Sequence, residues 1–154
     1  MYIYLIELVN LFCAGMLAGI EFVIHYGWRV PSEALDGKPR IQLRQALILK
    51  LRWIVPAFFV PMALSGLAVT LWGGAGRDFG LRCAAMLAVV SWIFVRVVGT
   101  VRINEATLTW HADAPPENWQ ERIRKAERFH VVGTWAAVIA FVCFLVAATP
   151  NPRL

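Results

Sequence analysis

Four apolar segments of nearly equal length dominate this chain of 154 residues. They cover roughly residues 3–24, 54–72, 81–101 and 131–148. A helix needs about 20 mainly apolar residues to cross the hydrocarbon core of a bilayer, and each segment has about that length. A helix also satisfies its own backbone hydrogen bonds, which a bilayer requires. We therefore expect an all-α protein, a four-helix transmembrane bundle.

The composition agrees with a membrane protein. Hydrophobic residues make up 59% of the chain, whereas about 45–50% is usual in soluble domains. With polar extensions included, the spans are expected at about residues 3–26, 50–72, 80–110 and 118–148, within a single domain of residues 1–154. The first apolar segment has no Lys or Arg before it and no small-residue cleavage site after it, so we expect a retained helix and not a signal peptide.

The positive charge is concentrated in the first and third connections between the apolar segments. The net charge is +5. The basic residues of these two connections are Arg29, Lys38, Arg40, Arg44, Lys50, Arg52, Arg102, Arg122, Arg124, Lys125 and Arg128. Because cytoplasmic loops collect Lys and Arg, we expect both connections in the cytoplasm and both termini outside, as in a bacterial inner-membrane protein. Anionic lipid headgroups are a sufficient partner for this charge, and no nucleic-acid partner is expected.

Two Glu–His pairs are expected at the same membrane face. Glu21 and His25 lie four positions apart at the end of the first span, and Glu127 and His130 lie three apart at the start of the last one. At either spacing, two side chains share a helix face. Because the two spans run in opposite directions, both pairs should lie at the cytoplasmic side. Ionisable residues inside a membrane are costly and commonly mark functional sites.

The third span should deliver further polar groups to this level. Asn104 and Glu105 lie near its inner end, and Arg96 lies deeper inside it. We expect Arg96 to face the bundle interior and to pair with a carboxylate or an anionic ligand group, with snorkelling to the headgroups as the alternative.

These residue types suit several kinds of chemistry. Imidazole and carboxylate groups hold iron with positions left for O2 or substrate, and imidazole also suits copper. The expected metal ligands are Glu21, His25, Glu127 and His130. Without metal, a His–Glu pair can remove a proton from a carbon acid. One alternative is a haem electron carrier with the two histidines as axial ligands. Another is a membrane partner or transporter in which the pairs are structural salt bridges.

Several other features carry weaker signals. Gly15 and Gly19 are spaced so that another helix can approach, which permits homo-oligomers. Glu7 and Asn10 are expected to be an interface residue and an interhelical hydrogen bond, with a second polar site as the alternative. His111 should lie outside the membrane and is the weakest candidate ligand. The three cysteines are scattered without a CxxC spacing, so no disulfide framework is expected.

The segment RINEATLTWHADAPPENWQERIRKAERFH resembles the region between the third and fourth spans of the anthrone oxygenase-like membrane family. The positions that carry the resemblance are Asn104, Trp110, Pro116, Trp119, Glu127 and His130. The first-span segment AGMLAGIEFVIHYGWRVP is similar to that family's small-residue helix, which ends in a polar or His position before a proline. Family members often carry Arg shortly after the last-span His, whereas this chain reads VVGTW; Arg96 is a candidate to supply that charge.

The resemblance implies a small integral membrane oxygenase that oxidises the methylene of a hydrophobic, aromatic substrate to a ketone. Asn104 would orient O2 or substrate, Arg96 would neutralise developing charge, and Glu105 would be a further ligand. The chain has no GxGxxG motif and no soluble domain for a dinucleotide, so neither flavin nor nicotinamide is expected. Oxygen chemistry would then use a divalent metal or direct activation of the substrate.

Overall fold

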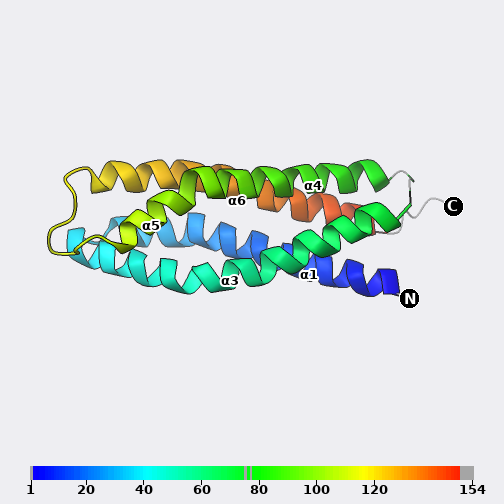
Figure 1. Ribbon diagram of the computed structural model, residues 1–154, viewed down its shortest axis with the longest axis horizontal. Helices are drawn as coiled ribbons and strands as arrows, with labels where there is room; N and C mark the ends of the chain where they lie inside the picture. Colours follow the sequence, from blue (N-terminus) through cyan, green and yellow to red (C-terminus); the bar gives the residue numbers. More distant parts are fainter. Residues whose placement is uncertain (1, 75, 77, 150–154) are drawn as a thin grey trace.

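The structure is a computed structural model that describes residues 2–74, 76 and 78–149. The chain forms four long helical runs, two of which contain a π-helical stretch (Figure 1). The elements are α1 (Tyr2–Phe22), η1 (Val23–Trp28), α2 (Arg29–Glu33), α3 (Gly37–Trp72), α4 (Asp78–Val95), η2 (Arg96–Val101), α5 (Arg102–Leu108) and α6 (Trp119–Ala148), where η marks the π-helical stretches. Helices α1 to α2 and α4 to α5 are each continuous runs.

All four runs are long and apolar enough to cross a membrane, so the expected four-helix bundle is confirmed. The observed runs cover Tyr2–Glu33, Gly37–Trp72, Asp78–Leu108 and Trp119–Ala148. The second run begins at Gly37 and not near residue 50, because the amphipathic stretch before the apolar segment continues the same helix. Helix α1 packs on α3 and α6, and α4 packs mainly on α6.

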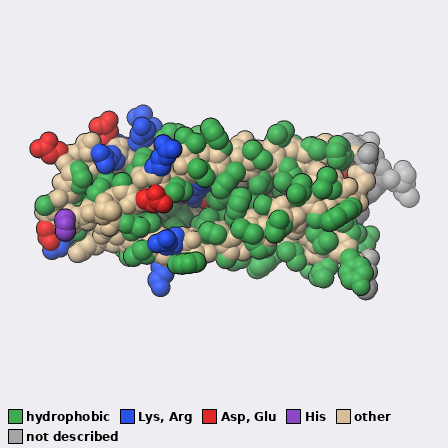
Figure 2. Space-filling model, viewed as in Figure 1, with side chains coloured by type: hydrophobic (Ala, Val, Ile, Leu, Met, Phe, Trp, Pro, Cys, Tyr) green, Lys and Arg blue, Asp and Glu red, His purple; other side chains and the backbone are tan. Residues whose placement is uncertain are grey.

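Small side chains fill much of the bundle interior, whereas large apolar side chains point outward. The core cluster contains six buried alanines: Ala14, Ala18, Ala85, Ala136, Ala137 and Ala140. Small residues let membrane helices approach closely, since lipid supplies no hydrophobic force that drives helices together. Green apolar side chains cover most of the face in Figure 2, and the Lys, Arg, Asp and Glu side chains gather at one end. This distribution suits a bundle surrounded by lipid along most of its length.

Two polar contacts connect the helices at the end opposite these charges. The side-chain amide of Asn10 donates to the Met62 carbonyl oxygen at 3.0 Å and lies 3.4 Å from the Ser65 hydroxyl. Glu7 forms an ion pair with Arg82 at 3.6 Å. Asn10 therefore makes the expected interhelical hydrogen bond, and Glu7 connects α1 to α4.

The antiparallel arrangement places η1, the start of α3, η2 and the start of α6 at the same end of the bundle (Figure 1). His25, Arg96, Glu127 and His130 lie on these elements, Glu21 lies at the end of α1 next to η1, and Asn104 and Glu105 lie on α5 after η2. Their expected convergence at one end is therefore observed.

Candidate functional site

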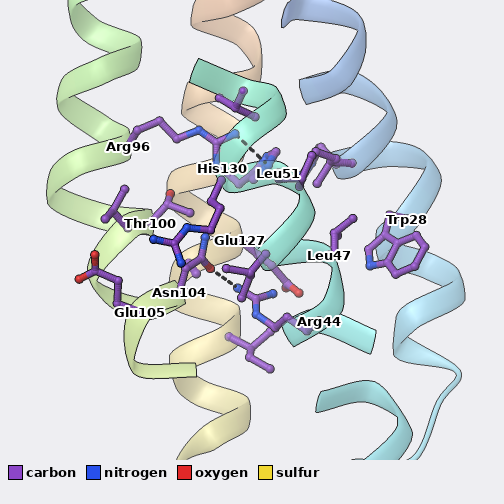
Figure 3. Close-up of a pocket in the computed structure, with 18 of the residues that line it drawn as sticks. Trp28, Arg44, Leu47, Leu51, Arg96, Thr100, Asn104, Glu105, Glu127 and His130 are labelled. Carbon is purple, nitrogen blue, oxygen red and sulfur yellow. Dashed lines mark hydrogen bonds between the residues drawn. The ribbon is translucent and has the colours of Figure 1, made fainter. Parts of the chain in front are cut away.

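A cavity of about 460 Å³ lies at the charged end of the bundle. Its walls come from all four helical runs, and its polar end carries arginine, glutamate and histidine side chains (Figure 3). Leu47, Leu51 and Phe59 of α3 contribute apolar wall, and Trp28 and Trp92 contribute aromatic rings. Small-molecule sites are commonly apolar clefts of about 300–1,000 Å³ with a few convergent polar groups.

Both π-helical stretches border this cavity. Stretch η1 carries His25, and η2 begins at Arg96 and contains Thr100. A π-helical turn is rare and occurs frequently at functional sites. In η2, Gly99 lies directly against the ring of Phe129, so the absence of a side chain there lets α6 approach η2 closely. The local packing thus brings the start of α6 next to Arg96.

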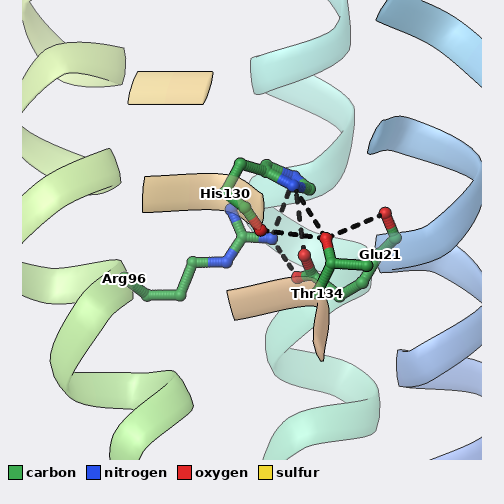
Figure 4. A network of polar contacts seen from close by, with 4 residues as sticks. All are labelled: Glu21, Arg96, His130 and Thr134. Carbon is green, nitrogen blue, oxygen red and sulfur yellow. Dashed lines mark hydrogen bonds and ion pairs between the residues drawn. The ribbon is translucent and has the colours of Figure 1, made fainter. Parts of the chain in front are cut away.

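A buried polar network joins three helices beside the cavity (Figure 4). Glu21 of α1 is fully buried and forms an ion pair with Arg96. Arg96 Nη2 also lies 3.4 Å from His130 Nε2, and the same ring nitrogen lies 3.4 Å from Glu21 Oε2. The expectation that Arg96 faces the interior and pairs with a carboxylate is confirmed. The carboxylate is that of Glu21, 75 positions away in the chain.

The contacts of His130 favour one tautomer in this network. A guanidinium can only donate hydrogen bonds, so the contact with Arg96 at 3.4 Å favours a lone pair on Nε2, whereas Glu21 Oε2 at the same distance would accept from a protonated Nε2. His130 Nδ1 lies 3.1 Å from the Thr134 hydroxyl, which donates to the His130 carbonyl oxygen at 2.9 Å. The hydroxyl oxygen is then free to accept from Nδ1–H. We infer that His130 is neutral, with its basic Nε2 between a guanidinium and a carboxylate.

Glu21 Oε2 has no hydrogen-bond partner, although it is buried. A buried carboxylate oxygen without a donor is costly. If His130 gained a proton at Nε2, that N–H would face Glu21 Oε2 across the observed 3.4 Å. The site therefore contains a base whose protonated form already has an acceptor in place.

The remaining candidate residues have different partners from those expected. His25 lies face to face with His130, with ring centroids 6.0 Å apart. Glu127 faces Arg29 and Arg40, at 3.8 and 3.9 Å, and is absent from the Glu21 network. Asn104 Oδ1 accepts a hydrogen bond from Arg44 of α3.

Two further candidates lie toward the end of the molecule. Glu105 is exposed and borders the cavity. His111 is exposed in the loop before α6 and does not border it. The loop is tied to α3 by an ion pair between Asp113 and Lys38 at 2.6 Å.

The arrangement of donors does not fit a metal held by the four expected ligands. Among residues 2–74, 76 and 78–149, no group of three or more His, Cys, Asp or Glu side chains is placed to hold a metal ion. Arg96 lies against both Glu21 and His130 Nε2, so its guanidinium is where a cation on these donors would be. An axial bond from His130 Nε2 to haem iron would also have to displace Arg96. Metal binding and haem binding stay predictions from the sequence.

Three polar residues of the site were not singled out from the sequence. Thr134 follows His130 by four positions, so helical spacing could have indicated it. In the sequence, Arg44 stands out only as one of the basic residues of the first connection. Thr100 carries no signal beyond its position one turn after Arg96.

Comparison of the chain with protein-family models, with curated proteins and with solved structures found no match. The resemblance to the anthrone oxygenase-like family therefore stays a prediction from the quoted segments.

Proposed function

We propose that this chain is an integral membrane oxygenase that deprotonates a hydrophobic, aromatic carbon acid and lets the resulting carbanion react with O2. The observation that carries the proposal is the neutral His130, which lines the cavity and whose Nε2 lies between Arg96 and Glu21. A base in hydrogen-bond reach of its substrate contributes about 10²- to 10⁴-fold to a rate. The oxygen step is supported by the sequence resemblance alone.

Each group of the network has a role in this reaction. His130 Nε2 takes a proton from an activated methylene group, and the imidazolium then donates to Glu21 Oε2. Arg96 offsets the negative charge that develops on the substrate, as positive groups do at developing anions. The carbanion forms a C–O bond with O2 and, after protonation, is a hydroperoxide. Loss of water breaks the O–O bond and leaves a ketone, so CH2 and O2 become C=O and H2O without an external reductant.

The shape of the cavity supports an aromatic substrate that arrives from the bilayer. Trp28, Phe59 and Trp92 provide flat apolar surfaces, and Phe59 and Trp92 already stack at a centroid distance of 4.8 Å. We place the cavity at the cytoplasmic side of a bacterial inner membrane, with both termini outside, because the basic residues gather at this end.

The test uses the full chain reconstituted into lipid vesicles with 1,8-dihydroxyanthrone as the probe. Anthraquinone absorbance and O2 consumption are followed together. We expect turnover above the spontaneous rate, and a loss of about 10²- to 10⁴-fold in His130→Gln. His111→Gln is the matched control, because this histidine is exposed and lies outside the cavity. Wild-type activity in His130→Gln would overturn the assignment of the base, and no turnover in the wild type would favour a structural network.

The same purified sample separates direct substrate activation from a metal or haem centre. Elemental analysis and an absorption spectrum are recorded before turnover. The proposed route expects activity that does not follow iron or copper content. Stoichiometric metal that is lost in both His25→Ala and His130→Ala would replace this route with a metal-dependent one. A strong Soret band would favour the haem alternative.

A further inference from the structure

Arg44 is a cavity arginine without a carboxylate partner in the described part of the chain. Its Nη2 donates one hydrogen bond to Asn104 Oδ1 at 3.2 Å. Its Nε is shielded from solvent and has no hydrogen-bond partner. By contrast, Arg96 has Glu21, and Arg29 and Arg40 face Glu127.

The charges around the cavity do not balance. Its lining contains five arginines and two glutamates: Arg29, Arg40, Arg44, Arg52, Arg96, Glu105 and Glu127. Glu21 pairs with Arg96 from behind the lining, and Glu33 pairs with Arg29 at 2.9 Å. Arg29 and Arg52 are also exposed, so Arg44 carries the excess positive charge that is shielded from solvent. A charge taken out of water without a partner is strongly unfavourable, so an excess of positive charge at the wall favours an anionic occupant.

Buried hydrogen-bond donors without partners also indicate an anionic occupant of the cavity. Four lining residues have a buried polar atom without a hydrogen-bond partner: Arg44 at Nε, Arg96 at Nε, Trp92 at Nε1 and Thr100 at Oγ1. Guanidinium and indole nitrogens can only donate. A purely hydrocarbon occupant would leave the Arg44 donor unsatisfied, whereas an occupant with acceptor oxygens can pair with it.

These donors lie at two levels of the cavity. Asn104, which holds Arg44, follows Arg96 by eight positions on one helical run, a rise on the order of 10 Å. Leu47 and Leu51 follow Arg44 on the same face of α3 and line the wall beyond it. The wall therefore offers a cationic level, an apolar stretch and then the Arg96–His130 level (Figure 3).

We propose that Arg44 binds an anionic oxyacid group of an amphiphilic ligand whose apolar body lies along α3 toward His130. Two sources share this chemistry: the carboxylate of an aromatic substrate and the phosphate of an anionic lipid. The identification of the ligand as substrate rests on the proposed function, whereas binding of the anion by Arg44 does not.

The test measures binding of a matched pair of fluorescent probes to the full chain in phosphatidylcholine nanodiscs. Anthracene-2-carboxylate and anthracene-2-methanol differ in charge but share one ring system. Energy transfer from tryptophan reports occupancy. We expect the carboxylate to bind at least about tenfold tighter than the alcohol, a typical scale for losing a hydrogen-bonded charge pair. Nanodiscs that contain phosphatidylglycerol should weaken carboxylate binding if lipid is the natural source, and should leave it unchanged if a substrate is.

Variants test whether Arg44 is responsible. Arg44→Gln should abolish the preference for the carboxylate, and Arg44→Lys, which keeps the charge, should retain part of it. Lys50→Gln is the matched control, because Lys50 is an exposed cation of the same helix outside the cavity. Equal binding of both probes by the wild type, or a full preference in Arg44→Gln, would overturn the proposal. Arg44→Lys keeps the test decisive if Arg44→Gln does not fold.

The outcome is separable from that of the oxygenase test. His130→Gln should lose turnover and keep the preference for the carboxylate, since it retains Arg44. A preference that depends on Arg44 in a protein without turnover would support this inference and contradict the proposed function. Turnover by a protein that binds the carboxylate and the alcohol equally would support the proposed function and contradict this inference.

Discussion

At the scale of single residues, the central contact of the site is the ion pair between Glu21 and Arg96. Both side chains are removed from bulk water, and Glu21 is fully buried. A buried pair gains little over a well-packed apolar pair, whereas removing one partner leaves an uncompensated charge. The pair therefore serves to position Arg96 and His130 and adds little stability.

This reasoning predicts that a second substitution at Arg96 offsets most of the stability lost by replacing Glu21. Glu21→Leu should lower the free energy of unfolding by about 3–5 kcal/mol, because it leaves Arg96 charged and unpaired. Glu21→Leu combined with Arg96→Met should recover most of that loss and remain inactive with the anthrone probe. Unfolding in mixed micelles measures the first quantity, and the turnover assay measures the second. Strictly additive losses in the double variant would contradict this account.

At the scale of elements, the contact between η2 and α6 sets the position of His130. Gly99 has no room for a side chain, because a Cβ there would overlap the ring of Phe129. Gly66 of α3 is similarly close to Phe144, whose Cζ would lie 2.7 Å from an added Cβ. The close contacts at these two glycines let the helices pack together around the polar network.

A pair of glycine substitutions tests this packing. Gly99→Ala should lower the free energy of unfolding by about 1–3 kcal/mol, because overpacking forces neighbouring groups to move. It should also reduce turnover, since it displaces the start of α6 from Arg96. Gly80→Ala is the control on the same helical run, where nothing lies within 4 Å of an added Cβ. There the substitution should be neutral or slightly stabilising in a helix. Equal effects at the two positions would indicate that the close contact is unimportant.

At the scale of the whole molecule, the gathering of charge at one end determines how the bundle is expected to lie in a membrane. The end with α2, the start of α3 and the loop before α6 carries most of the charged side chains in Figure 2. Basic residues accumulate on the cytoplasmic side of membrane proteins. The cavity would then open near the cytoplasmic leaflet.

Labelling of single cysteines tests this orientation. In a background without the three native cysteines, Asp113→Cys should react with an impermeant thiol reagent only after cells are permeabilised. Gly76→Cys, between the second and third helices, should react in intact cells. Both positions are exposed, so accessibility is limited by the membrane alone. The reverse pattern would place the cavity at the outer side and contradict the positive-inside interpretation.

The sequence predicted the elements well because helix length and apolarity are local properties. The last three runs end within two residues of the expected positions, whereas the first continues to Glu33 and the second begins at Gly37, because polar turns extend both helices beyond their apolar segments. The opposite directions of the first and last spans correctly predicted Glu21 and His130 at one end, and helical phase predicted which residues share a face. The phase did not predict their partners. Glu127 was expected beside His130 in a common site, yet it faces Arg29 and Arg40, because the rotation of α6 relative to α3 decides which side chains meet.

The sequence by itself thus determined four membrane-length helices and the end of the bundle where the ionisable groups gather. Both follow from the cost of exposing polar backbone and charge to lipid. Only the tertiary structure decided that Arg96 neutralises Glu21, that Thr134 orients His130 and that Arg44 lacks a carboxylate partner among the described residues. These contacts depend on close packing at small residues such as Gly99, which fixes the rotation and separation of helices that are far apart in the chain.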